Sequence, residues 1–137
     1  MQEFRAAVEA GDHEAMERAL ADDVVLHGPV AITPYEGRAT VAAILRAARR
    51  VMGPEFRYVR EITDPGGRDH ALIFTATLAG KRINGCDLLH LDEAGKIDEF
   101  TVMVRPLSGV QALNEAMGSQ FGRIVGEANA ANPPGDA

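Results

Sequence analysis

The sequence predicts an α+β domain in which a curved antiparallel sheet wraps around helices, giving a cone with an internal apolar pocket. Three observations support this fold class. Helical patterns with one short strand between them begin the chain, four strand patterns follow in succession, and a helical pattern comes after them. Hydrophobic residues make up 46% of the 137 residues, which is ordinary for one core. We expect a single domain over residues 1–125 and a disordered, Pro- and Gly-rich tail over 126–137.

The N-terminal patterns predict three helices and one strand. Two short helices occupy residues 1–22 and separate at a Gly-Asp pair, where Asp12 would cap the second helix. A strand over 24–29 ends at a Gly-Pro pair. The clearest helix spans 37–52, and the spacing of its apolar residues gives it one buried face: Val41, Ile44, Leu45, Ala48 and Met52. The opposite side, which we expect to face solvent, carries Arg46, Arg49 and Arg50.

The rest of the chain predicts consecutive strands and a last helix. The strand patterns cover Phe56–Thr63, His70–Leu78, Lys81–Leu91 and Ile97–Arg105. The helix spans 108–125 and opens with a capping box formed by Ser108 and Gln111. Its apolar face consists of Val110, Leu113, Met117, Phe121 and Ile124. We expect this helix to close the pocket.

Two turns decide which side chains share a face of the sheet. A two-residue turn at Ala79-Gly80 places Leu72 opposite Asp87. A four-residue turn over 93–96 places Val102 opposite Asp87, whereas a five-residue turn would bring two more charged side chains onto that face. Because burying further charges is costly, we favour the shorter turn. The predicted inner face is then Leu72, Phe74, Ala76, Ile83, Gly85, Asp87, Leu89, Phe100, Val102 and Val104.

Asp87 is the one acid on this predicted inner face. The other members are non-polar, so the surroundings should favour the neutral carboxyl and raise its pKa. Asp87 would then be a proton donor near neutral pH. The structural alternative is an acid that a backbone group or a water molecule satisfies, and that only holds the sheet together.

Three further side chains are candidates for the same site. His27 ends the first strand and could act as a general base, although alternation with the neighbouring Leu26 would point it away from the pocket. Tyr58 could direct its hydroxyl into the cavity and shares a face with Arg60 in a regular strand. Tyr35 could lie at the pocket mouth. Both tyrosines could equally be core or rim aromatics.

Composition argues against several classes of function. The net charge of −6 argues against nucleic-acid binding, and no apolar run is long enough to span a membrane. The N-terminal residues lack the features of a signal peptide, so we expect a cytoplasmic protein. The single cysteine and four scattered histidines give no metal-ligand spacing, and we expect neither a metal nor another cofactor.

The outer face of the predicted sheet mixes apolar and polar side chains. It carries Cys86, Leu88, His90, Thr101, Met103 and Arg105. This face is too apolar to be fully solvated and too polar to be a core. We therefore expect a homodimer that forms through the outer sheet face.

Three stretches resemble the nuclear transport factor 2-like superfamily, particularly its bacterial polyketide cyclase-like and ketosteroid isomerase-like branch. "GDHEAMERALADDVVLHGP" is similar to the opening helix pair and first strand, "YEGRATVAAIL" to the glycine-led third helix, and "GCDLLHLDEAGKIDEFTV" to the closing hairpin. The resemblance covers residues 2–120 and implies the cone-shaped fold. Because the superfamily includes both enzymes and binding proteins, it implies less about chemistry.

The resemblance places Asp87 on the protonated acid of the ketosteroid isomerases. Their general-base Asp falls on Gly28 and their oxyanion Tyr on Phe4, and the essential Asp of the polyketide cyclases falls near Val102. Steroid isomerisation by that mechanism is therefore not expected. We expect a pocket with Asp87 and His27 as catalytic residues and with ligand contacts from Phe4, Tyr35, Tyr58, Leu72, Phe74, Leu89, Phe100, Val102 and Val104.

The predicted function is a cofactor-independent enzyme of isomerase, cyclase or hydratase type that acts on an apolar small molecule. Asp87 would donate a proton or hydrogen bond to a substrate oxygen. The alternative is a non-catalytic binding protein in which Asp87 anchors one polar atom of an apolar ligand. A structural dimerisation module would explain the outer face but not the buried acid.

Overall fold

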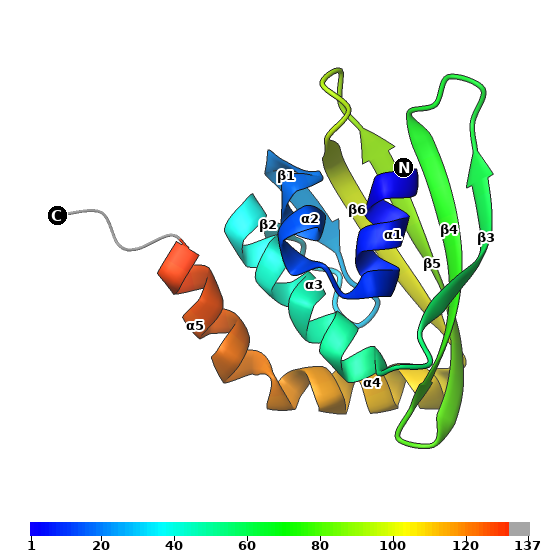
Figure 1. Cartoon of the computed structure of the whole chain (residues 1–137). Helices are drawn as coiled ribbons and strands as arrows, with labels where there is room; N and C mark the ends of the chain where they lie inside the picture. The colour runs from blue at the N-terminus through cyan, green and yellow to red at the C-terminus, as the bar shows by residue number, and fades with distance from the viewer. Residues whose placement is uncertain (132–137) are drawn as a thin grey trace, which may run out of the picture.

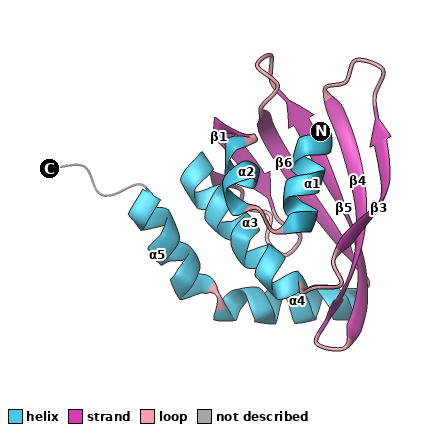
Figure 2. Cartoon of the chain, viewed as in Figure 1, coloured by secondary structure: helices cyan, strands magenta, loops and turns pink. Residues whose placement is uncertain are grey.

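Helices cover one face of a curved, six-stranded sheet, and no described helix lies on its other face (Figures 1 and 2). The computed structural model describes residues 1–131, and the predicted tail from 132 onward lies outside the described residues. The α+β class with a curved, open sheet is confirmed. No helix in the described part of the chain is long and apolar enough to cross a membrane.

The N-terminal helices form where the sequence predicts them. Helix α1 (Gln2–Ala10) ends at Gly11, whose φ of 70° is left-handed, and α2 (His13–Arg18) begins at Asp12. The carboxylate of Asp12 accepts a hydrogen bond from the backbone N–H of Ala15 at 3.1 Å, which confirms the predicted cap. Helix α3 (Arg38–Met52) buries the predicted apolar face against the sheet.

The six strands are β1 (Leu20–His27), β2 (Tyr35–Glu36), β3 (Arg57–Thr63), β4 (Asp69–Leu78), β5 (Lys81–Leu91) and β6 (Ile97–Arg105). Their order in the sheet is β2-β1-β6-β5-β4-β3. All neighbours are antiparallel except β1 and β6, which run parallel. The sequence did not predict this parallel pair or the short edge strand β2, and it placed the start of β1 four residues too late.

The register around Asp87 agrees with the prediction. Asp87 pairs with Leu72 on β4 and with Val102 on β6. Both connecting turns use glycine where the backbone is left-handed, with φ of 76° at Gly80 and 80° at Gly95. The inner face of the sheet is thus the predicted apolar face with one acid in it.

The predicted last helix is two helices. Helix α4 (Leu107–Ser119) crosses one end of the sheet, and α5 (Phe121–Ala131) turns away from it and packs along α3 (Figure 1). Pro106 occupies the N-cap position of α4 without a side-chain cap bond, so the predicted capping box is wrong. Helix α5 continues past Gly126, where the sequence predicts a disordered tail. Contacts with α3 hold it, because Ile124 packs on Ala43 and Ala47.

Gly85 allows the closest approach inside the sheet. It lies opposite Phe74, and a Cβ atom on Gly85 would come within 2.2 Å of Cζ of Phe74 and 2.8 Å of the Met103 carbonyl oxygen. The backbone carbonyl cannot move without breaking the β5–β6 pairing. The ring of Phe74 therefore packs over Gly85 and next to Phe56, at a centroid distance of 5.1 Å.

Gly85→Ala should lower the free energy of unfolding by about 1–3 kcal/mol, because it overpacks a well-filled core. Urea denaturation followed by circular dichroism measures this change. Gly118→Ala in α4 is the matched control, since a Cβ there meets nothing within 4 Å. The control should be neutral or stabilise by up to about 1 kcal/mol. Equal stabilities for the two variants would contradict the packing.

Candidate active site

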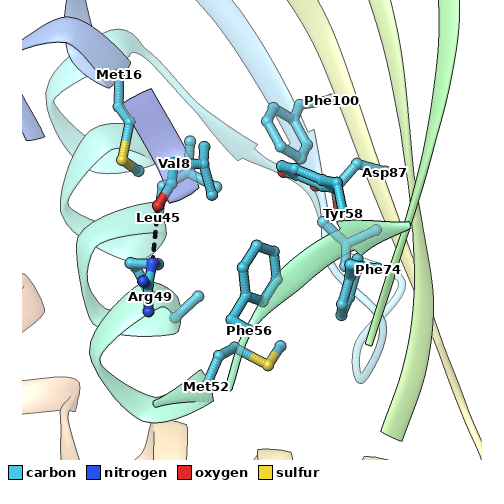
Figure 3. A pocket seen from close by; sticks show the side chains of 12 residues that line it. Val8, Met16, Leu45, Arg49, Met52, Phe56, Tyr58, Phe74, Asp87 and Phe100 are labelled. Atoms are coloured by element: carbon cyan, nitrogen blue, oxygen red, sulfur yellow. Dashed lines mark hydrogen bonds between the residues drawn. The ribbon is translucent and has the colours of Figure 1, made fainter. Parts of the chain in front are cut away.

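A small cavity lies between the helices and the inner face of the sheet. Its volume is about 60 Å³. Figure 3 shows Leu45, Arg49 and Met52 on the α3 side and Tyr58, Phe74 and Asp87 on the opposite, strand side. The full lining is Val8, Met16, Leu45, Ala48, Arg49, Met52, Phe56, Tyr58, Phe74, Asp87, Phe100 and Val102. The walls are therefore apolar apart from Arg49, Tyr58 and Asp87.

Asp87 and Tyr58 form a hydrogen bond at the cavity wall. The Tyr58 hydroxyl donates to Oδ2 of Asp87 at 2.7 Å. The two residues expose only 6% and 4% of their surface, respectively. This is the one hydrogen bond of the Asp87 carboxyl with described residues, so the second oxygen, Oδ1, has no protein partner among them.

Burial controls the protonation of both groups. Removal from water raises the pKa of Asp87 to about 7, although the hydrogen bond from Tyr58 acts in the opposite direction. Burial and the neighbouring Asp87 carboxylate raise the pKa of Tyr58 well above its usual value. Tyr58 therefore stays neutral at physiological pH, while Asp87 changes its charge near neutrality.

A bulge in β3 separates the faces of Tyr58 and Arg60. Tyr58 pairs with Phe74 and Arg60 with the next residue of β4, Ile73, so Val59 is an extra residue in the strand. The bulge turns Arg60 to the outer face, and the predicted shared face of Tyr58 and Arg60 is wrong. The guanidinium of Arg5 on α1 donates to the Tyr58 carbonyl oxygen at 3.1 Å and fixes the strand there.

Arg49 joins two helix ends beside the cavity. Its Nε donates to the Val8 carbonyl at 2.8 Å and its Nη1 to the Gly53 carbonyl at 2.8 Å. These carbonyls lie at the C-terminal ends of α1 and α3, where the helix dipoles favour a cation. Arg49 is thus a structural clamp. The expectation that it only faces solvent is wrong.

The other two arginines predicted to face solvent pair with α5. Nε of Arg46 lies 3.2 Å from Glu127, and Nη1 of Arg50 lies 3.5 Å from the same carboxylate. Together the three arginines connect α3 to α1 and to α5, so this side of α3 is an interface between helices.

The structure brings together only part of the predicted site. The predicted residues that line the cavity are Tyr58, Phe74, Asp87, Phe100 and Val102. Leu72, Leu89 and Phe4 are buried in the surrounding core, and Phe4 packs edge-on against Phe100 at 5.7 Å. Val104 is partly buried beside that core, and Tyr35 lies on β2 with 43% of its surface exposed.

His27 does not meet Asp87. The alternation of β1 buries Leu26 and turns His27 to the other face, where its Nε2 lies 3.9 Å from Glu99. His27 is not among the residues that line the cavity. The geometry therefore gives it no part in proton transfer at Asp87.

The remaining lining residues come from α1, α2 and α3 and from the residue before β3: Val8, Met16, Leu45, Ala48, Arg49, Met52 and Phe56. None of the described lining residues belongs to α4 or α5, so the expectation that the last helix closes the pocket is wrong. The helical periodicity had already placed Leu45, Ala48 and Met52 on the buried face of α3, but not next to Asp87. Nothing in the sequence indicates which helix residues face an acid on a distant strand. Within the described residues, no group of three His, Cys, Asp or Glu side chains could hold a metal ion.

The family of the chain follows from comparison with known proteins. Residues 1–100 match the model of the SnoaL-like domain. The chain belongs to this family, which is part of the nuclear transport factor 2-like superfamily, and the resemblance predicted from the sequence is confirmed. A search of curated proteins finds no match.

Two solved structures resemble this chain over most of its length. One is a steroid delta-isomerase from Pseudomonas aeruginosa, 34% identical, with a TM-score of 0.85, and the match covers 91% of this chain and 90% of that one. The other is an uncharacterised protein with a cystatin-like fold from Silicibacter pomeroyi, 32% identical, with a TM-score of 0.85, covering 94% and 92%. A designed protein with a curved β-sheet, 17% identical over 85% of this chain and 90% of its own, shares the fold alone, with a TM-score of 0.69.

The raised pKa of Asp87 predicts how stability depends on pH. Between about pH 4 and pH 7 the unfolded state has lost a proton that the folded state keeps, so stability falls as the pH rises through this range. The loss attributable to Asp87 is up to roughly 4 kcal/mol, and it stops above about pH 7.

Asp87→Asn removes this titration. Relative to wild type, the free energy of unfolding of the variant should therefore rise by a few kcal/mol between about pH 4 and pH 8. Urea denaturation at a series of pH values measures the difference. Glu93→Gln, at an exposed position in the β5–β6 turn, is the matched control. A difference that does not change with pH would mean that Asp87 is already ionised in the folded protein.

Proposed function

We propose that this protein is a small-molecule enzyme of isomerase, cyclase or hydratase type, with Asp87 as the group that donates a proton or hydrogen bond. The observation that carries this proposal is the buried Tyr58–Asp87 pair, at 2.7 Å, on the wall of an apolar cavity. Perturbed carboxyls in such positions are frequently functional. The similarity to a steroid delta-isomerase supports a reaction of this class.

In this proposal the two oxygens of Asp87 have different tasks. Oδ2 accepts the hydrogen bond from Tyr58, which orients the carboxyl group and leaves Oδ1 for a ligand. In the neutral acid, Oδ1 carries the proton and donates it toward a carbonyl, hydroxyl or epoxide oxygen of the substrate. As that oxygen gains negative charge in the transition state, the hydrogen bond strengthens. Tyr58 acts through Asp87 and is a positioning residue.

The lining favours an uncharged, apolar substrate. In the described residues the cavity wall offers no second carboxyl group and no imidazole, so Asp87 is the one group there that titrates near neutral pH. A cavity of about 60 Å³ is smaller than a typical ligand site of roughly 300–1,000 Å³, so a substrate must displace side chains to enter. Met16 and Met52 line the cavity, and their unbranched side chains are suited to such movement.

Activity should depend on the protonated form of Asp87. The value of kcat/KM, measured by NMR with a panel of apolar cyclic ketones and epoxides, should fall as the pH rises above about 7. Asp87→Asn should lower it by about 10²–10⁴-fold, because the amide cannot transfer the proton.

Tyr58→Phe is the discriminating variant for this role. It removes the hydrogen bond that lowers the pKa of Asp87, so the falling limb of the pH profile should move to higher pH. A lower rate with an unmoved limb would contradict the role of Asp87. Ligand-induced chemical shifts at the cavity without turnover of any compound would identify a binding protein instead.

We also propose that the protein is a homodimer that associates through the outer sheet face. Leu88 and Met103 expose 41% and 48% of their surface at the centre of this face. Met103 pairs with Cys86, and Leu88 pairs with Thr101, in neighbouring rows of β5 and β6. Large apolar side chains on a face that no helix of residues 1–131 covers favour contact with another protein surface.

Met103→Glu should raise the dimer dissociation constant by about a hundredfold or more, because it would bury an unpaired charge at the contact. Sedimentation velocity measures the change. Phe121→Glu is the matched control, since Phe121 is 63% exposed at the start of α5, which packs along α3 on the helical side of the sheet. An unchanged profile for Met103→Glu would show that this face is not the contact.

A further inference from the structure

The Arg49 side chain forms part of the cavity wall and also reaches the protein surface. Of the described lining residues, only Ala48, Arg49 and Val102 are partly exposed, and the others are buried. Helix α4 packs on both α3 and β6, the elements that carry Ala48 and Val102. Arg49 instead extends toward α1, whose close backbone contacts are with α2 and β3. The Arg49 side chain therefore joins two helices whose backbones make few close contacts.

Arg49 closes the seam between the ends of α1 and α3 with hydrogen bonds to backbone carbonyls. Its Nε donates to the Val8 carbonyl (Figure 3) and its Nη1 to the Gly53 carbonyl, both at 2.8 Å. Its Nη2 lies 3.5 Å from the Glu9 carbonyl, on the exposed side. Val8 itself lines the cavity, and Gly53 follows the lining residue Met52. The bonds of Arg49 thus span the seam directly beside the cavity.

These bonds can break without leaving a buried group unpaired. The Val8 carbonyl also accepts from the Gly11 N–H at 3.1 Å, and the Gly53 carbonyl from the Phe56 N–H at 3.3 Å. Both carbonyls therefore keep a partner when Arg49 leaves. Among residues 1–131, no carboxylate lies within 4.0 Å of Arg49, so its departure breaks no ion pair, and water can hydrate the free guanidinium.

The Phe56 ring lies against the Arg49 guanidinium. Cζ of Arg49 is 5.5 Å from the ring centroid, within the range of a cation–π contact. The other described rings that line the cavity, those of Tyr58, Phe74 and Phe100, belong to strands, whereas Phe56 lies in the connection between α3 and β3. Release of Arg49 would free the Phe56 ring from this contact and let a cavity of about 60 Å³ expand on this side.

We propose that Arg49 is the gate of the cavity. When its side chain swings into solvent, a path opens along the seam between α1 and α3, and the Phe56 ring moves aside to admit a substrate. When the side chain returns, its bonds to the Val8 and Gly53 carbonyls close the path and keep water from Asp87. This inference rests on the proposed function, because it concerns access to the same site.

A cysteine placed in the cavity reports on access without a substrate. The chain has one cysteine, so Cys86→Ser gives a cysteine-free background. In that background, Leu45→Cys places a thiol on the cavity wall. Val41→Cys is the matched control, since Val41 lies one turn earlier on α3, is fully buried and is not among the lining residues. Mass spectrometry follows the modification of each thiol by methyl methanethiosulfonate, a small neutral reagent.

Arg49→Ala should raise the modification rate at Leu45→Cys by about tenfold or more relative to that at Val41→Cys, because the bonds that close the seam are lost. Arg49→Lys keeps the cation but not the fork that holds two carbonyls, so it should raise the same ratio by a smaller factor. Circular dichroism checks that each variant is folded.

The dependence on urea distinguishes a gate from unfolding in the chain that keeps Arg49. The swing of one side chain exposes little surface, so modification at Leu45→Cys should not depend on urea up to about 1 M. Modification at Val41→Cys requires unfolding and should become faster over the same range.

The contrary results separate the gate from the proposed function. If Arg49→Ala raises both rates equally, Arg49 only stabilises the fold, and if it raises neither, access lies elsewhere; the gate is wrong in both cases. If Leu45→Cys responds to urea as the control does, the cavity opens by unfolding, which also overturns the gate. None of these results bears on catalysis by Asp87. A flat pH profile of kcat/KM would overturn catalysis and leave Arg49 as the gate of a binding site.

Discussion

The burial of one carboxyl group against one phenol is the constraint on which the candidate site depends. Asp87 lies on a face that otherwise packs as a hydrocarbon core, and Tyr58 is its one hydrogen-bonding partner among the described residues. A buried acid without any partner would cost about 1–3 kcal/mol or more. The bond offsets part of this cost and still leaves the pKa near 7, because burial outweighs the hydrogen bond. The stability of the fold and the proposed proton donation by Asp87 thus depend on the same balance between burial and this hydrogen bond.

The helices that close the cavity are fixed to each other and to β3 through backbone carbonyls. Arg5 of α1 holds the Tyr58 carbonyl, and Arg49 of α3 holds the carbonyls of Val8 and Gly53. Hydrogen bonds to the backbone fix the positions of whole helices and not only of single side chains. The position of Tyr58, and through it the orientation of Asp87, therefore depends on where α1 and β3 lie relative to each other.

The sequence predicts the register of β4, β5 and β6 because a wrong register would bury extra charges. It therefore places Asp87 opposite Leu72 and Val102 correctly. Alternation cannot reveal the bulge at Val59, since one inserted residue inverts the faces without changing the composition. The division between α4 and α5 is equally hidden, because the apolar pattern continues through the break and only packing on α3 determines it. Because such packing details are hidden in the sequence, it identifies Asp87 as a buried acid and suggests Tyr58, but it does not predict the hydrogen bond between the two side chains.

One register determines both faces of the sheet. Asp87 points inward only if Cys86 and Leu88 point outward, and the same alternation places Glu99 and Arg105 at opposite ends of the outer face. Because β4 holds β5 in place, a slip of one residue between β5 and β6 would turn Glu99 and Arg105 onto the face that carries Asp87. The orientation of Asp87 and the charge pattern of the outer face therefore both follow from the pairing of these strands. The predicted four-residue turn is wrong, because Leu91 pairs with Ile97 and the Asp92 N–H donates to the Lys96 carbonyl. A bulge at Asp98 restores the register that the four-residue turn would have given, so the bulge is the feature that keeps Glu99 on the outer face.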